Sequence, residues 1–228
     1  MGKRSRAINA DLFIKNVADF DAARAAVFSQ GGPRSLRDPN KATRAIYTLA
    51  MAFCAAIDIL KTGDKKTPAT YFEYLIGHLM AKRLGVSPTN AIEVLNLDAR
   101  TGVKVELPTD FIFDPGPGKT KFHVPVKLST RERVIQAWAH QRVIDGAYGA
   151  RRFSGLLAVM SETLLSQKTK VVTEVCLPDQ WRIYQMFIAW LTRVYYLDMP
   201  VGYSSMSTEY PRIDVKGFGH FFDEADDL

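Results

Sequence analysis

The sequence predicts a mixed α/β domain that carries a helical N-terminal segment. Apolar residues recur at the i, i+3, i+4 spacing of an amphipathic helix through the first third of the chain, and the period changes to two near residue 103. Helix-like and strand-like segments then alternate, as in α/β domains. The chain has 228 residues, of which 47% are hydrophobic and 24% charged, so it can bury the core of one globular domain.

Three helices are predicted in the N-terminal part of the chain. Residues 11–28 and 41–61 have helical patterns and are separated by a breaker that contains two glycines and a proline. The third helix has Thr67 as its N-cap and Pro68 at its first position, and Gly85 ends it.

Residues 103–128 are predicted to form a β-hairpin. Alternating apolar residues mark the first strand, a run that begins at Phe122 marks the second, and a turn rich in proline and glycine joins them. Pro125 interrupts the second run, and we expect an edge or a bulge there because proline cannot donate to a strand ladder. The Gly-Lys-Thr run at 118–120 lacks the earlier glycine and the following helix of a phosphate-binding loop, so we expect a turn and no nucleotide cofactor.

The second half of the chain is predicted to alternate between helices and short strands. A helix runs from about Thr130 to Tyr148, and strands follow at 156–160 and 170–176. An aromatic-rich helix is predicted from Gln180 to Leu197, with its apolar stripe in the core or at a dimer interface.

The charge of the chain is unevenly distributed. The net charge is +6, and removing the four carboxylates of the last six residues raises it to +10 for the remainder. We expect residues 223–228 to be a solvated, frayed acidic tail, after a helical segment 1–66 packed on an α/β core of 67–222. The basic balance permits a polyanionic partner without identifying it.

Several classes of protein are disfavoured by the sequence. No apolar run approaches the ~20 residues of a membrane span, and the basic N-terminus lacks the apolar region of a secretory signal. Cys54 and Cys176 lie in apolar segments and indicate buried thiols in a reducing cytoplasm, not a disulfide or a zinc site. We therefore expect a cytoplasmic protein with no membrane partner.

Two carboxylates and a lysine form the most informative set of residues. Asp110 and Lys127 lie near the ends of two adjacent predicted strands, and Glu73 flanks the apolar stripe of the third helix. Phosphodiester hydrolysis uses a divalent cation held by hard oxygen ligands, and a lysine can orient the attacking water and offset charge. The residue types fit this chemistry, but an ordinary hairpin also carries such residues.

The sequence around these residues resembles a nuclease family. The runs Leu107-Pro-Thr-Asp110 and Val124-Pro-Val-Lys127 resemble the core of PD-(D/E)xK nucleases, most closely type II restriction endonucleases. The run from Lys127 to Gln136 resembles a segment of restriction enzymes that cut CCGG- or CCNGG-like sites. The resemblance covers roughly residues 68–180. It implies a restriction-endonuclease-like mixed sheet flanked by helices.

The resemblance also implies a role for each residue. Asp110 and Glu73 would hold Mg²⁺, with the backbone carbonyl of Val126 as a further ligand, and Lys127 would assist the attacking water. Glu73, Asp110 and Lys127 fall in the order and in the predicted elements that the family uses.

The sequence departs from the family pattern at two positions. Pro125 stands where the family has an acidic residue, and His140 stands where some relatives have a glutamate. Asp114 and Glu132 are weaker substitutes for the missing carboxylate. Because of Pro125, a DNA-binding protein with an inactive nuclease core remains an alternative.

The helix after the hairpin is predicted to face DNA. Its candidate DNA-binding residues are Arg131, Arg133, Gln136 and His140, and the alternative is an ordinary solvated face. Arginine can contact guanine edges or clamp phosphate, and the resemblance favours this because the helix begins beside the proposed active site. We therefore expect a magnesium-dependent type II restriction endonuclease that cuts a short duplex DNA site as a homodimer. The alternatives are a repair, recombination or transposition nuclease of the same fold, and a catalytically degenerate DNA-binding protein.

Overall fold

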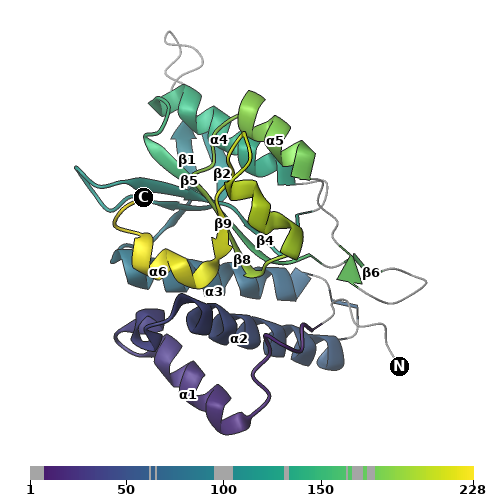
Figure 1. Ribbon diagram of the computed structural model, residues 1–228. Helices are drawn as coiled ribbons and strands as arrows, with labels where there is room; N and C mark the ends of the chain where they lie inside the picture. Colours follow the sequence, from purple (N-terminus) through teal and green to yellow (C-terminus); the bar gives the residue numbers. More distant parts are fainter. Residues whose placement is uncertain are drawn as a thin grey trace.

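A mixed seven-stranded sheet lies at the centre of the molecule, between two layers of helices (Figure 1). This computed structural model describes residues 8–61, 63–64, 66–94, 105–130, 134–162, 164–165, 172–173 and 178–228. The α-helices in this part of the chain are α1 (Val17–Phe28), α2 (Pro39–Leu60), α3 (Lys66–Leu84), α4 (Ile135–Tyr148), α5 (Pro178–Phe187) and α6 (Phe221–Glu224). Short 3₁₀ helices are η1 (Gly32–Leu36), η3 (Val201–Ser207) and η4 (Phe218–His220).

The sheet has an antiparallel half and a parallel half. Its strands are β1 (Thr89–Val94), β2 (Val105–Phe113), β3 (Lys121–Val124), β4 (Val126–Lys127), β5 (Phe153–Ser161), β8 (Arg193–Asp198) and β9 (Val215–Gly217). They follow the order β1-β2-β3-β5-β8-β9, and β4 pairs with β5. The ladders β1–β2 and β2–β3 are antiparallel, and those from β3 to β9 are parallel. A separate two-stranded sheet joins β6 (Leu164–Leu165) and β7 (Val172–Thr173).

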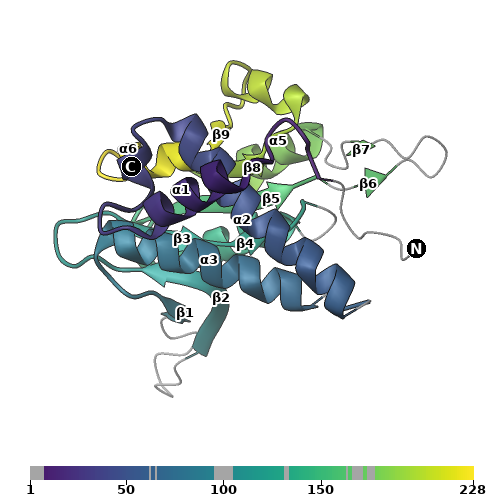
Figure 2. The ribbon, with the colours of Figure 1, turned by 90° about the horizontal axis from the view of Figure 1, so that it is seen from below.

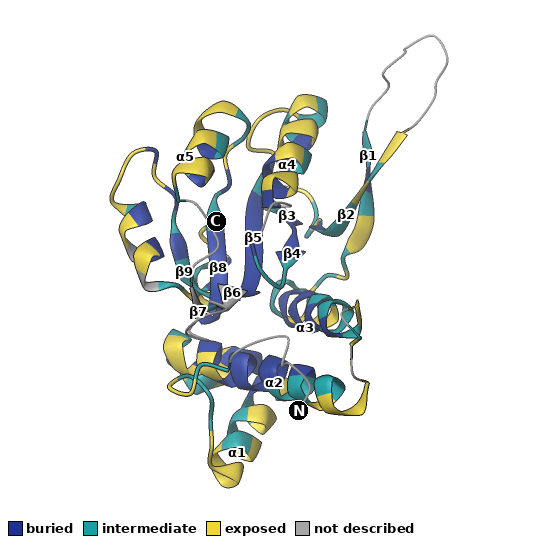
Figure 3. Cartoon of the chain, turned by 90° about the vertical axis from the view of Figure 1, so that its right-hand side faces the viewer, coloured by how far each residue is buried: buried dark blue, intermediate teal, exposed yellow. Residues whose placement is uncertain are grey.

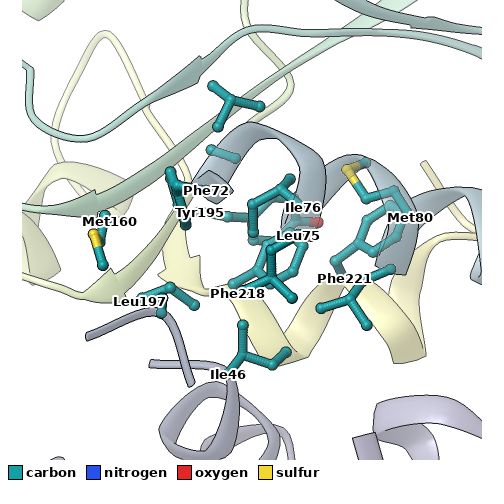
Figure 4. Close-up of a cluster of buried hydrophobic side chains, with 14 of the residues drawn as sticks. Ile46, Phe72, Leu75, Ile76, Met80, Met160, Tyr195, Leu197, Phe218 and Phe221 are labelled. Carbon is teal, nitrogen blue, oxygen red and sulfur yellow. The ribbon is translucent and has the colours of Figure 1, made fainter. Parts of the chain in front are cut away.

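The two faces of the sheet carry different helices. α4 and α5 cover one face, where Trp138 and Trp181 are fully buried with a ring-centroid distance of 5.5 Å (Figures 1 and 3). α3 and α2 lie side by side on the other face, α3 against β2 and β4 and α2 against β8 and β9, and α1 packs on α2 (Figures 2 and 3). Figure 4 shows the core on this side, where Ile46 of α2 and Phe72 of α3 lie with Phe218 near the C-terminus. The predicted mixed α/β domain with N-terminal helices is confirmed.

The N-terminal helices differ in detail from the prediction. α1 begins at Val17, after an Asn16 side chain that accepts a hydrogen bond from the Asp19 N–H. α3 begins at Lys66, so Thr67 is not its N-cap. The Asp64 carboxylate accepts from the N–H groups of Lys66 and Thr67, and it therefore caps the helix instead.

α2 contradicts the expectation that no segment is long and apolar enough to cross a membrane. Among the residues that the structure describes, α2 is the one helix that is long and apolar enough to cross a membrane, judged by its length and composition alone. Half of the apolar stretch is buried inside the protein, because its Ile46, Leu49 and Met51 belong to the core. A core helix of a globular protein passes the same test of length and composition.

The aromatic helix predicted to reach Leu197 is wrong in its second half. α5 ends at Phe187, and residues 193–198 form β8, a parallel strand between β5 and β9. Val194, Tyr195, Tyr196 and Leu197 are all buried, because helices cover both faces of the parallel half of the sheet. Apolar and polar residues do not alternate along such a strand, so periodicity alone cannot distinguish it from a segment of buried helix.

The acidic C-terminal residues are also not a frayed tail. Glu224 lies on α6 and its carboxylate accepts hydrogen bonds from the Tyr195 hydroxyl at 2.6 Å, from Arg193 and from Lys216. Asp226 binds Arg83 of α3, and Ala225 is buried. The carboxylates therefore anchor the C-terminus to β8, β9 and α3.

We expect Glu224→Gln to lower the free energy of unfolding by about 2–3 kcal/mol at pH 7, because it weakens charge-assisted hydrogen bonds that are mostly shielded from water. Burial acts to raise the pKa of Glu224, but hydrogen bonds from Lys216 and Tyr195 and the charge of Arg193 outweigh it and lower the pKa below its usual 4.5. The stabilisation is therefore present above pH 4.5 and is lost as the pH falls below that value. Urea unfolding at several pH values measures it, with the exposed Asp223→Asn as the control.

Candidate active site

The end of the β2–β3 ladder creates the candidate site. The ladder stops at the pair Phe111↔Val124, and Pro125 then has no N–H to continue it. The next N–H, that of Val126, donates to Oδ2 of Asp110 at 2.7 Å. The Asp110 side chain thus replaces a backbone carbonyl as the acceptor. Pro125, where an edge or a bulge was expected, interrupts an internal strand between β3 and β4.

Asp110 and Lys127 meet at this break. The Lys127 ammonium donates to the same Oδ2 of Asp110 at 2.8 Å, and about three-quarters of each side chain is shielded from solvent. Within the described residues, Oδ1 of Asp110 accepts no hydrogen bond. One oxygen of the carboxylate is therefore left for another partner.

These two side chains line a cleft beside α4. Side chains alternate along β2, and Ile112 packs against Ile144 of α4, so Asp110 points to the α4 side of the sheet. The cleft has a volume of about 240 Å³. It is lined by Pro108, Thr109, Asp110, Pro125, Lys127, Gln136, Ala137 and His140.

Glu73 approaches Asp110 from α3, on the other side of the sheet. Burial raises the pKa of Glu73, the negative charge of Asp110 raises it further, and the positive charge of Lys127 opposes both. The three predicted catalytic side chains therefore lie close enough to act on one another electrostatically. β4 forms its ladder with β5 and not with β2, which leaves the sheet open at this point.

The carboxylates fit a magnesium ion that also binds substrate. Among the residues that the structure describes, no three histidine, cysteine or acidic side chains form a complete metal cluster. Mg²⁺ usually takes one or two carboxylates, and waters and substrate phosphates supply its other ligands. A cation would also favour the charged form of Glu73, whose pKa is raised by burial and by the negative charge of Asp110. Because the N–H and C=O of one strand residue point to the same side, the Val126 carbonyl is turned toward Asp110 as well.

Two histidines lie near this cleft in different environments. His140 lines it, and burial followed by the charge of Lys127 lowers the pKa of His140, while Asp110 opposes them. His123 is fully buried behind it, and burial lowers the pKa of His123 to about 4. Gln141 donates through Nε2 to Phe153 and Asp145, so its Oε1 accepts from Nδ1 of His123 at 3.0 Å. Burial therefore favours the neutral form of both imidazoles.

The structure brings some of the predicted DNA-binding residues to this cleft. Gln136 and His140 line it. Arg131 and Arg133 lie outside the described residues, and so do three other residues for which the sequence predicts a structure or a role, Val103, Glu132 and Cys176. Asp114 does not reach the site, because its carboxylate binds the Gly116 N–H and Lys121 in the β2–β3 turn. Pro108 and Thr109 were missed as lining residues, although their position beside Asp110 could have indicated them.

Comparisons with known proteins support the fold. No protein family and no curated protein sequence matches the chain. The crystal structure of the Type IIP restriction endonuclease Kpn2I is similar with a TM-score of 0.77 and 24% identity, over 97% of this chain and 75% of that one. The PspGI restriction endonuclease in complex with substrate DNA has a TM-score of 0.47 and 16% identity, over 84% of this chain and 76% of that one. The likeness to Kpn2I shows that this chain has a restriction-endonuclease-like fold, as its sequence predicted.

Proposed function

We propose that the protein is a magnesium-dependent type II restriction endonuclease that hydrolyses phosphodiester bonds at a specific short sequence of duplex DNA. One observation carries the proposal: Asp110 and Lys127 share a hydrogen bond in a cleft, within electrostatic reach of Glu73, on a fold similar to that of Kpn2I. Metal-dependent phosphodiester hydrolysis needs these residue types together.

Each side chain has a defined task in this proposal. Asp110 and Glu73 hold the metal with the Val126 carbonyl, and when bound the metal polarises the phosphate and lowers the pKa of the attacking water. The Lys127 ammonium, held by Asp110, orients that water and offsets negative charge on the phosphate. Asp110 also holds Val126 in place through the N–H that Pro125 leaves without a ladder partner.

DNA lies along the N-terminal part of α4 in this proposal. Gln136 and His140 line the cleft that contains Asp110, so a scissile phosphate there brings DNA within their reach. Neutral His140 can donate or accept a hydrogen bond, and Gln136 can read adenine. Arg131 and Arg133 directly precede α4 in the sequence and supply positive charge for phosphate or guanine.

A homodimer is the assembly that fits a palindromic site, because the two-fold symmetry of the protein then matches that of the DNA. The buried Trp181, Tyr195 and Tyr196 belong to the core, not to an interface. Exposed apolar side chains of α5, among them Ile183 and Phe187, provide surface of the kind that subunit contacts cover.

Plasmid digestion with and without Mg²⁺ tests the function. We expect discrete bands with Mg²⁺ and none with EDTA, and the sequenced fragment ends should be related by a two-fold axis. A smear would support a nuclease for repair or recombination. DNA that shifts in a gel but stays uncut would support the binding protein with an inactive core, which Pro125 leaves possible.

A further inference from the structure

Gly77 is an unexpected residue at its position in α3. It is buried in the middle of a 19-residue helix, between Ile76 and Leu79 of the core. Glycine in a helix interior costs about 1 kcal/mol relative to alanine. Its backbone does not have the positive φ that would require glycine. A packing reason must therefore compensate for its low helix propensity.

The ring of Phe111 provides that reason. A Cβ atom at position 77 would lie 2.5 Å from Cζ of Phe111, 2.8 Å from Cε1 and 3.0 Å from Cε2. All three atoms belong to the outer edge of the ring, so the ring points directly at the backbone of α3. Any side chain at position 77 would have to displace the ring or lift the helix.

This contact lies beside both proposed metal ligands. Gly77 follows Glu73 by four residues, so the two share one face of α3. Phe111 follows Asp110 directly in β2. The approach of the ring to Gly77 therefore sets the separation of the two segments that carry the carboxylates.

We propose that Gly77 is a positioning residue that sets how closely Glu73 approaches Asp110, by letting Phe111 fit against α3. The proposal rests on the proposed function, because it assigns a purpose to the spacing of the two metal ligands. Gly77 touches neither metal nor substrate and acts only through Phe111.

α4 offers a matched control. Gly146 is also a helical glycine, but a Cβ built on it meets nothing within 4 Å. Gly146→Ala therefore adds the same methyl group without a clash. Leucine at position 111 lacks the outer ring atoms that a methyl at position 77 would strike, so Phe111→Leu can relieve Gly77→Ala.

Mn²⁺ titration of the full chain, followed by electron paramagnetic resonance, tests the proposal without relying on cleavage. We expect Gly77→Ala to weaken Mn²⁺ binding about 10–100-fold, as is usual when a residue that orients a metal ligand is changed. Gly146→Ala should bind like the wild type. The double variant Gly77→Ala/Phe111→Leu should bind within about threefold of Phe111→Leu alone, which makes the two effects strongly non-additive.

Two results would overturn the proposal: unchanged Mn²⁺ affinity in Gly77→Ala, or additive losses in the double variant. If the wild type itself bound no Mn²⁺, the proposed function would fail. Crystal structures of the wild type and Gly77→Ala would still decide the positioning role. A larger Glu73–Asp110 separation in the variant supports the role, and an unchanged one rejects it.

Discussion

Asp110→Asn should abolish DNA cleavage and leave the protein folded. The neutral amide is a poor magnesium ligand, and a bound metal contributes several kcal/mol to transition-state stabilisation. At 1.36 kcal/mol per tenfold change, the cleavage rate should fall by about a thousandfold or more. Asparagine keeps an oxygen that can accept the Val126 N–H, so the break after the β2–β3 ladder should keep its geometry. Single-turnover cleavage of a plasmid with a mapped site measures the rate.

The chain contains a matched control for this substitution. Asp114 also pairs with a lysine, Lys121, but in the exposed turn beyond β2, away from the cleft. Asp114→Asn should therefore cut DNA at the wild-type rate. Asp110→Ala is a harsher change, because it leaves the Val126 N–H without its acceptor at a cost of about 1–3 kcal/mol. Wild-type cleavage by Asp110→Asn would remove Asp110 from the proposed site.

The sequence predicted the proximity of Asp110 and Lys127 because a hairpin constrains its own register. A short turn joins β2 and β3, so residues near the ladder end must meet. The sequence did not reveal that the Asp110 side chain would bind the Val126 N–H, since this depends on where the ladder stops. How closely Glu73 approaches Asp110 depends on how closely α3 packs against β2. That packing involves the contact between Gly77 and the Phe111 ring, which is a feature of the tertiary structure.

The errors in the predicted fold have a common physical cause. β8 is buried on both faces, so its residues lack the alternation that reveals a half-exposed strand. The acidic C-terminus looked solvated because its cationic partners, Arg83 and Arg193, lie far away in the sequence. Both segments owe their structure to contacts with parts of the chain that are distant in the sequence.

Lys127→Met should slow cleavage about 10²–10³-fold, the usual cost of removing one group that stabilises charge in the transition state. Methionine keeps an unbranched apolar stem of similar length and removes the charge. Asp110 would still hold the Val126 N–H, so the fold around the cleft should persist. Lys121→Met is the matched control, because Lys121 forms the equivalent ion pair with Asp114 in the turn and should not affect cleavage.

The metal affinity of Lys127→Met separates the proposed role of the lysine from that of Asp110. Asp110→Asn removes a ligand, so Mn²⁺ binding and cleavage should both fall. Lys127→Met removes a cation that shares Oδ2 of Asp110, so Mn²⁺ should bind at least as tightly as in the wild type while cleavage falls. If Lys127→Met instead lost Mn²⁺ binding as fully as Asp110→Asn, the lysine would be a support for the carboxylate and not a group that acts on the attacking water.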